Sequence, residues 1–158
     1  MTNIEIEMMN GDVIKAELYP DVAPITVENF VKLINENFFD GLIFHRVIRG
    51  FMIQGGGYDV NGTHKDAASI KGEFTANGVT NNLKHTRGVL SMARTMFPNS
   101  ASSQFFIMHE DAPHLDGQYA AFGKVTEGIE AVDKIAECAT DMGDAPLEPQ
   151  VIKTIRLA

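Results

Sequence analysis

The sequence contains very little cysteine and no long hydrophobic run. Cys138 is the single cysteine among 158 residues, so the chain cannot form an internal disulfide. The opening residues, MTNIEIEMMNGD, have neither the basic region nor the apolar region of a secretory signal. No apolar run approaches the length that spans a bilayer. We therefore expect a soluble protein in a reducing, cytoplasmic setting.

Basic residues are also scarce. Thirteen Lys and Arg stand against 21 Asp and Glu, which gives a formal net charge of −8 at pH 7. A field of this sign repels phosphate backbones and anionic lipid headgroups. Nucleic acid and membrane surfaces are therefore not expected as partners. With 44% hydrophobic residues, the chain can bury the core of one domain, expected over residues 1–158.

Most of the chain has the pattern of short strands. Apolar and charged residues alternate over residues 4–8, and the Asn10-Gly11 pair predicts a hairpin with a type I′ turn into a second strand. Short strands separated by Gly, Asn, Asp and Pro clusters are expected over residues 41–123, which is typical of a barrel or sandwich. The final VIKTIRLA reads as a strand that pairs with the first one and closes a barrel.

Two segments have the helical period instead. Apolar residues recur at i, i+3, i+4 and i+7 from Val27 onwards, and Thr26 precedes them as an N-cap, so we expect a helix over residues 26–36. A second helix is expected over residues 128–138. Composition and periodicity alone therefore predict a mainly-β domain with two helices.

The segment FHRVIRGFMIQGGG carries an arginine and a glutamine within two apolar strands. Side chains alternate across a strand, so Met52 and Gln54 are expected on one face and Phe51 and Ile53 on the other. A hairpin turn between the strands would bring Arg46 beside Gln54. The run of glycines is expected to form a bend or bulge next to this site.

The segment SQFFIM, residues 103–108, repeats the arrangement. Gln104 and Phe106 share one face, while Phe105 and Ile107 share the other and are expected in the core. The mixed faces predict a surface that binds a mostly apolar chain and donates a few directed hydrogen bonds. The alternative is that the arginine forms a partly buried ion pair and the glutamines satisfy backbone groups at a sheet edge.

Other catalytic chemistries have less support. The five histidines have no metal-binding spacing and are expected at the surface or in turns, so no metal is expected. Ser102, Ser103, His109 and Asp111 are the residue types of a hydrolytic triad, but they crowd one strand and its following loop. The GGG run lacks the continuation of a phosphate loop or a dinucleotide fingerprint, so no nucleotide cofactor is expected.

Five motifs occur in the order and approximate spacing of one family. They are FHRVIRGFMIQGG, NGT, KHTRGVLSMA, SSQFFI and HLDGQYAAFGKV. On these motifs the chain resembles the cyclophilin-type peptidyl-prolyl isomerases over essentially its whole length. The resemblance implies a closed eight-stranded antiparallel β-barrel capped by two α-helices, with an active-site groove on its outer surface. It also implies isomerisation of Xaa-Pro bonds in proline-containing peptides and unfolded chains, without a cofactor.

The resemblance assigns roles to individual residues. Arg46 matches the catalytic arginine, and Gln54 and Phe106 belong to the same catalytic group. The expected substrate-binding residues are Phe51, Met52, Gly62, Ala93, Arg94, Thr95, Gln104, His114, Leu115 and Tyr119. The alternative is a non-catalytic proline-peptide binding module or chaperone that uses the same groove.

Three departures from the family pattern lie around this groove. His114 stands where eukaryotic members carry a tryptophan that assists cyclosporin binding, and Tyr119 where they carry a histidine, so cyclosporin is a doubtful ligand. The loop from Arg94 to Ser102 is one residue longer and bulkier, with Met96 and Phe97 where small residues are usual. The chain otherwise resembles single-domain bacterial cytoplasmic members, and we expect a monomer.

Overall fold

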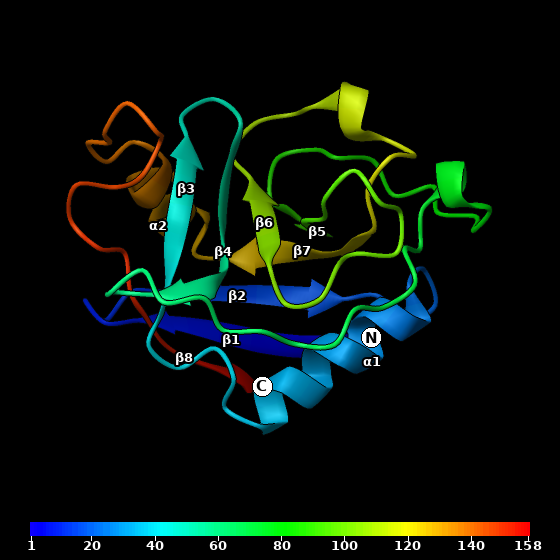
Figure 1. The fold of residues 1–158 in the computed structure, drawn as a ribbon, viewed down its shortest axis with the longest axis horizontal. Helices are drawn as coiled ribbons and strands as arrows, with labels where there is room; N and C mark the ends of the chain where they lie inside the picture. Colours follow the sequence, from blue (N-terminus) through cyan, green and yellow to red (C-terminus); the bar gives the residue numbers. More distant parts are fainter.

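The strands form one curled antiparallel sheet. The computed structural model describes residues 1–158, and its strand order is β3-β4-β6-β5-β7-β2-β1-β8 (Figure 1). The strands are β1 (Thr2–Met8), β2 (Val13–Leu18), β3 (Leu42–Ile48), β4 (Met52–Asp59), β5 (Val89–Met92), β6 (Phe105–Met108), β7 (Ala121–Glu127) and β8 (Ile152–Leu157). Helix α1 (Pro24–Asn35) lies at the lower right of Figure 1 and α2 (Ile129–Ala136) at its left, and both contribute to the inner apolar cluster; Thr75–Asn77 and Pro113–Leu115 form 3₁₀ turns.

The two ends of the sheet meet, so the sheet is nearly closed. β1 pairs with both β2 and β8, as the sequence predicts. The Gly41 N–H donates to the Ile152 carbonyl at 2.9 Å, and the Phe44 N–H donates to the Gln150 carbonyl at 3.0 Å. These bonds join the start of β3 to β8 and leave little unpaired edge. The expected eight-stranded barrel with two helices is confirmed.

The turn between β1 and β2 differs from the expected one. The hairpin is present, but only Gly11 has a positive φ (95°), whereas a type I′ turn needs a positive φ at both central residues. The Gly11 N–H donates to the Met8 carbonyl at 2.9 Å, and the Asp12 N–H donates to the Asn10 side-chain oxygen at 2.9 Å. The asparagine side chain therefore fixes a wider loop, and the type I′ prediction was wrong.

Helix α1 begins at Pro24, earlier than expected, with Ala23 as its N-cap. Proline is well suited to the first helical position because its missing N–H needs no partner there. Thr26 consequently lies in the first turn and is fully buried. Its N–H and its hydroxyl both donate to Glu73 Oε1, at 2.6 and 2.8 Å. Glu73, far away in the sequence, thus does the capping that was expected of Thr26.

Aromatic rings fill the inside of the barrel. Phe30, Phe39, Phe44, Phe105 and Phe122 are all fully buried in the larger apolar cluster. The Phe105 ring lies edge-on to Phe30 at a centroid distance of 5.2 Å and to Phe44 at 5.9 Å, which is a favourable arrangement for aromatic pairs. A barrel packed in this way keeps its binding surface on the outside.

A second apolar cluster lies on the outer face of the same strands. Ile53, Phe105 and Ile107 belong to the inner cluster, as the alternation predicts. The outer cluster consists of Met52, Val89, Phe106, Met108, Ala112, Leu115 and Ala121. Phe51 packs against this outer cluster because it belongs to the turn that precedes β4, where strand alternation does not apply. The expectation from alternation that Phe51 shares a face with Ile53 was therefore wrong, and Phe51 lies on the outer side, where the family resemblance implies it.

Two histidines are buried, contrary to the expectation of surface or turn positions. His85 and His109 are both almost fully buried. His85 Nδ1 lies 3.1 Å from Asp116 Oδ1, so it carries the ring proton, and Nε2 accepts from the Ser91 hydroxyl at 2.8 Å. The His85 ring also stacks on Phe106 at 6.0 Å. Ser91 is fully buried, so this Ser-His-Asp series supports the outer cluster and meets no substrate.

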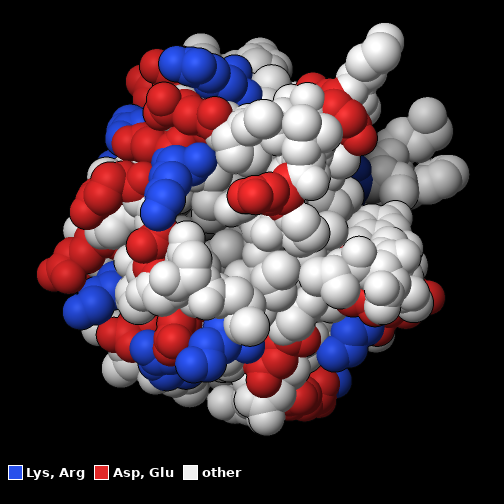
Figure 2. All heavy atoms as spheres, turned by 90° about the vertical axis from the view of Figure 1, so that its left-hand side faces the viewer, with Lys and Arg blue, Asp and Glu red and all other residues white.

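Charges of both signs mix on the surface. Figure 2, which shows the left-hand side of Figure 1, has basic side chains lying among acidic ones. Arg156, for example, pairs with Glu5 at 2.9 Å and with Glu7 at 2.7 Å. The negative net charge is therefore distributed without a large patch of one sign on this face. No helix is both long enough and apolar enough to cross a membrane.

The Glu73 contact predicts a stability difference between two substitutions. Glu73→Ala leaves the Thr26 N–H and hydroxyl buried without their acceptor, so we expect the free energy of unfolding to fall by about 2–3 kcal/mol. Glu73→Gln keeps a side-chain oxygen that can accept, so its loss should be smaller. Urea denaturation measures both, and equal losses in the two variants would contradict the proposed acceptor role.

The buried His85 predicts a loss of stability in mild acid. Burial lowers the pKa of His85 below its ordinary value of 6.5, although Asp116 acts in the opposite direction. The unfolded chain therefore binds more protons than the folded one below pH 6.5, and stability falls there by at most about 1.4 kcal/mol per pH unit for this group. Denaturation at several pH values from neutral to acid should show a shallower decline for His85→Gln. Parallel declines would show that His85 is not the group responsible.

Candidate active site

One row of paired residues crosses four strands and forms the base of the site. Arg46 on β3 pairs with Gln54 on β4, Gln54 pairs with Phe106 on β6, and Phe106 pairs with Ser91 on β5. Residues paired across neighbouring strands point to the same face of a sheet. The register therefore places the guanidinium, the carboxamide and the aromatic ring together on the outer face of the barrel.

Hydrogen bonds between side chains hold the polar part of this row. Arg46 Nη1 donates to Gln54 Oε1 at 3.3 Å, and Gln54 Nε2 donates to Gln104 Oε1 at 3.0 Å. Arg46 is exposed and has no carboxylate partner, so the alternative of a partly buried ion pair was wrong. The glutamines bond to each other rather than to backbone groups. Because a guanidinium has five N–H donors, most of those on Arg46 stay available to a ligand.

The absence of a side chain at Gly57 in β4 leaves the space that the Gln104 side chain occupies. A Cβ atom at Gly57 would lie 2.5 Å from Gln104 Cγ, which is closer than side-chain atoms can approach. The β3–β4 pairing also shifts register on either side of Phe44, so the expected bulge beside the site is present. The glycine run therefore shapes the site in two ways: it leaves space for Gln104, and it lies where the β3–β4 pairing bulges.

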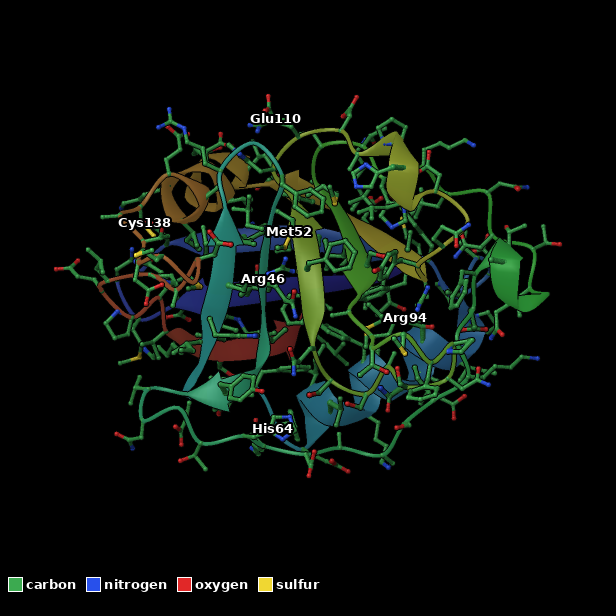
Figure 3. All side chains as sticks on the ribbon, turned by 45° about the horizontal axis from the view of Figure 1, so that its top comes forward. Arg46, Met52, His64, Arg94, Glu110 and Cys138 are labelled. Atoms are coloured by element: carbon green, nitrogen blue, oxygen red, sulfur yellow. The ribbon has the colours of Figure 1, made fainter.

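A groove beside this row has mostly apolar walls. Its volume is about 390 Å³, and its lining residues are Arg46, Phe51, Met52, Gln54, Ala93, Arg94, Phe106, His114, Leu115 and Tyr119. The Tyr119 ring lies edge-on to Phe106 at 5.8 Å, and the His114 ring lies 5.8 Å from Phe51. Figure 3 shows Arg46 and Met52 close together over the strands, with Arg94 farther along toward the lower right. A compact apolar ring fits between such walls, with directed donors at one side.

A smaller, polar hollow continues the groove. Its volume is about 160 Å³, and it is lined by Gln54, Ala93, Arg94, Thr95, Ser100, Ser102 and Gln104. Every expected site residue thus lies on the groove or this hollow except Gly62. Gly62 lines a separate pocket with His45 and Tyr58, because β4 runs away from the groove before it reaches this loop. Ser100 was not predicted at the site, and Ser102 was considered only for a hydrolytic triad; neither carries a signal for the hollow beyond its place in the loop before Gln104.

Arg94 is used mainly to fix the walls of the groove. Its Nη2 and Nε donate to the Gln118 carbonyl at 2.7 and 3.2 Å, and its Nη1 donates to the Thr95 carbonyl at 2.9 Å. The guanidinium carbon lies 4.7 Å from the centre of the Phe74 ring and 4.6 Å from that of Tyr119. Arg94 therefore joins two loops and holds Tyr119 against the groove.

The nucleophile candidates do not form a hydrolytic site. The Ser103 hydroxyl is buried and donates to the Gly56 carbonyl at 2.7 Å. His109 bonds to the Gly50 backbone rather than to Ser103. Cys138 lies away from the groove, at the left of Figure 3, and burial raises the pKa of its thiol. A catalytic triad at Ser103 is therefore incompatible with these contacts.

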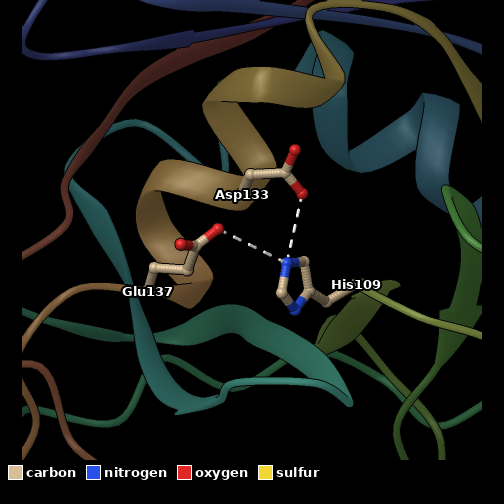
Figure 4. Close-up of side chains that lie close together, drawn as sticks. All are labelled: His109, Asp133 and Glu137. Atoms are coloured by element: carbon tan, nitrogen blue, oxygen red, sulfur yellow. Dashed lines mark ion pairs between the residues drawn. The ribbon is translucent and has the colours of Figure 1, made fainter.

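One cluster has the residue types of a metal site, at the far end of the β3–β4 hairpin. His109 Nε2 lies 3.2 Å from Asp133 and 3.8 Å from Glu137 (Figure 4). Arg87 occupies both oxygens of Asp133, at 2.6 and 2.7 Å, and this bond holds the pKa of Asp133 below its ordinary value. His109 Nδ1 accepts from the Gly50 N–H at 2.9 Å, so Nε2 carries the proton that faces the carboxylates. These contacts favour a link between the hairpin and α2 over metal coordination.

Comparison with known proteins identifies this arrangement. The family model for cyclophilin type peptidyl-prolyl cis-trans isomerase/CLD matches residues 3–157. A peptidyl-prolyl cis-trans isomerase of Acinetobacter baylyi is 44% identical over 166 residues, which cover 99% of this chain and 85% of the relative.

Solved structures agree with the sequence comparisons. The crystal structure of a cyclophilin type peptidyl-prolyl cis-trans isomerase from Cryptosporidium parvum superposes with a TM-score of 0.88 and 32% identity, over 99% of this chain and 97% of that one. A crystal structure of the same protein in the presence of the dipeptide Ala-Pro gives a TM-score of 0.84 and 31% identity, over 99% and 98% of the two chains. The chain therefore belongs to the cyclophilin-type peptidyl-prolyl cis-trans isomerases.

Proposed function

We propose that Arg46 accelerates rotation about Xaa-Pro bonds by donating a hydrogen bond to the prolyl nitrogen as the peptide twists. The observation that carries this proposal is an exposed guanidinium without a carboxylate partner, held by Gln54 at the edge of an apolar groove. The groove walls formed by Phe51, Met52, Phe106 and Leu115 hold the pyrrolidine ring. The relative whose structure was solved in the presence of the dipeptide Ala-Pro supports a proline-containing peptide as the occupant.

The chemistry needs a donor and a shaped groove. Resonance gives the peptide C–N bond partial double-bond character, with a rotation barrier of roughly 18–20 kcal/mol. Rotation localises the nitrogen lone pair, so a donor aimed at nitrogen binds the twisted state more strongly than either planar state. Arginine stays protonated at all physiological pH values and presents its donors in a rigid plane. No bond breaks, so the reaction requires no nucleophile, general base or cofactor.

One hydrogen bond is too weak to account for the whole effect. A 10⁵-fold acceleration corresponds to about 7 kcal/mol, whereas a hydrogen bond to a charged group contributes about 1.5–3 kcal/mol. The remainder comes from preorganised binding: the ring is fixed on one side of the bond, while Gln54, Gln104 and the segment Ala93–Thr95 hold the peptide on the other. The carbonyl of the residue before proline then rotates while the rest of the bound peptide stays fixed.

The client is a flexible chain, and the enzyme acts as a monomer. A groove that is open at the surface admits an extended segment of an unfolded or mobile protein, which is the substrate that assistance to folding requires. The cytoplasmic setting expected from the single cysteine stays a prediction, as does the monomeric state. The alternative from the sequence was a non-catalytic binding module, and the relatives named as peptidyl-prolyl cis-trans isomerases favour catalysis over it.

Substitution of Arg46 tests the catalytic role. We expect Arg46→Ala and Arg46→Lys to lower kcat/KM on a proline tetrapeptide by roughly 10- to 150-fold, because the charged hydrogen bond to nitrogen is lost or misplaced. Arg49→Ala is the matched control, since Arg49 is an exposed arginine in the turn of the same hairpin. Circular dichroism should be unchanged in all three. Near-full activity in the Arg46 variants would rule out the donor role, and wild-type binding without faster exchange in NMR spectra would favour the binding module.

The His114 position predicts weak inhibition by cyclosporin. His114 is exposed beside Phe51, and the tryptophan that it replaces supplies both an N–H donor and a larger ring. We expect His114→Trp to lower the cyclosporin inhibition constant by roughly tenfold, the gain of one hydrogen bond. His114→Phe separates the two contributions because it adds ring area without a donor. An inhibition constant that is the same in His114→Trp and wild type would contradict the assignment.

A further inference from the structure

We propose that Met96 and Phe97 form an apolar tip that binds an apolar side chain of the client, upstream of the proline in the groove. This inference rests on the proposed function, because it concerns how the same client is held. The two side chains are 84% and 67% exposed. The other exposed large apolar residues are isolated in the sequence, and none of them is next in sequence to a residue of the groove or its polar hollow, whereas Met96 directly follows Thr95 of the hollow; they are Met1, Met9, Ile25, Val60, Met142, Leu147 and Leu157.

The tip is continuous with the groove. Thr95 and Ser100, which flank the tip in the sequence, line the polar hollow, and that hollow shares Gln54, Ala93 and Arg94 with the groove. A peptide that leaves the groove over the hollow meets polar groups that can bond to its backbone, and beyond them it meets the tip. We therefore place the client side chain that meets the tip roughly two to four residues before the proline, since an extended chain advances about 3.3 Å per residue.

The loop that carries the tip is fixed by a circuit of hydrogen bonds. The Thr95 hydroxyl donates to Ser100 Oγ at 2.8 Å, and the Ser100 hydroxyl donates to the Phe97 carbonyl at 2.7 Å. The Thr95 N–H donates to Ser100 Oγ at 2.9 Å, and the Phe97 N–H donates to Thr95 Oγ1 at 3.2 Å. These hydrogen bonds fix the loop backbone in a conformation that leaves the Met96 and Phe97 side chains exposed to water.

Anchors on each side attach this loop to the rest of the protein. Arg94 ties its start to the Gln118 carbonyl, as described above. Near its end, Asn99 Oδ1 accepts from the Gly72 N–H at 3.0 Å and from Asn77 Nδ2 at 2.9 Å. A preformed apolar tip loses little entropy when it binds, which is the condition for a useful contact of small area.

An unfolded chain is the occupant that fits these features. Its apolar side chains are exposed, whereas those of a folded partner are buried. The tip is small and its contact is accordingly weak, which suits an enzyme that must release each client after turnover. The neutral lining of the adjoining hollow, apart from Arg94, sets no requirement for charge on the client. The tip therefore selects for apolar residues upstream of proline.

A double-mutant cycle between protein and peptide tests this. The probes are two Ala-Pro peptides that differ only in Phe or Ser about three residues before the proline. We expect the wild-type protein to bind the Phe peptide roughly fivefold more tightly than the Ser peptide by calorimetry, and Met96→Ser/Phe97→Ser to remove this preference. The variant should retain the hydrogen-bond circuit, since only side chains in water change.

The controls separate this inference from the proposed function. Met142→Ser/Leu147→Ser is the matched control, because these side chains are 104% and 65% exposed and lie in another loop; it should keep the wild-type preference. Phe97→Leu should keep most of it. An unchanged preference in the Met96/Phe97 variant overturns the inference, as does a tip-dependent dimer in sedimentation. Because calorimetry needs no turnover, near-full activity of the Arg46 variants, which would rule out the donor role, leaves this binding result readable.

Discussion

The pairing register of β3, β4, β6 and β5 is the constraint on which the rest of the structure depends. It aligns Arg46, Gln54, Phe106 and Ser91 in one row on the outer face, while the next row, with Ile53 and Ile107, faces the core. Side chains alternate with a period of two, so a slip by one residue would turn the guanidinium into the core and the core residues into water. The same alignment therefore decides both which side chains fill the barrel and where the polar groups of the groove lie.

The groove owes its rigidity to buried or paired polar groups outside this row. His85 supports Phe106 from beneath, Arg94 holds Tyr119 at the wall, and His109 holds the hairpin turn at Gly50. A reaction that breaks no bond depends on how much better the protein fits the twisted peptide than the planar one. A flexible groove would adapt to the twisted and the planar peptide alike, and the difference between the two binding free energies would be lost. The contacts of His85, Arg94 and His109 therefore help to keep the shape of the groove fixed, although these contacts are made within the protein.

Local patterns predicted the elements, and contacts between distant residues decided what the patterns missed. Strand alternation correctly predicted that Phe105 and Ile107 lie in the core. The family motifs correctly predicted most of the residues that line the groove. Both kinds of prediction use only residues that are close together in the sequence. The Thr26–Glu73 bond and the burial of His85 against Asp116 join segments far apart in the sequence, which no local signal reveals. Phe51 was misplaced because β4 begins one residue after it, so strand alternation does not reach it. The turn at Asn10 was misjudged because the Asn10 side chain accepts a hydrogen bond from the Asp12 N–H, while the Asn10 backbone keeps a negative φ.

The neighbours of Arg46 explain how a chain of net charge −8 keeps one guanidinium free. The groups that hold it in place are glutamines, whose amide oxygens accept a hydrogen bond without neutralising the charge. A carboxylate at either position would pair with the cation and direct its donors away from the groove. Arg49, Arg87 and Arg156 pair with carboxylates, and Arg94 donates to the backbone carbonyls of Gln118 and Thr95. Two neutral amides in series therefore orient Arg46 and leave its positive charge unneutralised at the edge of the groove.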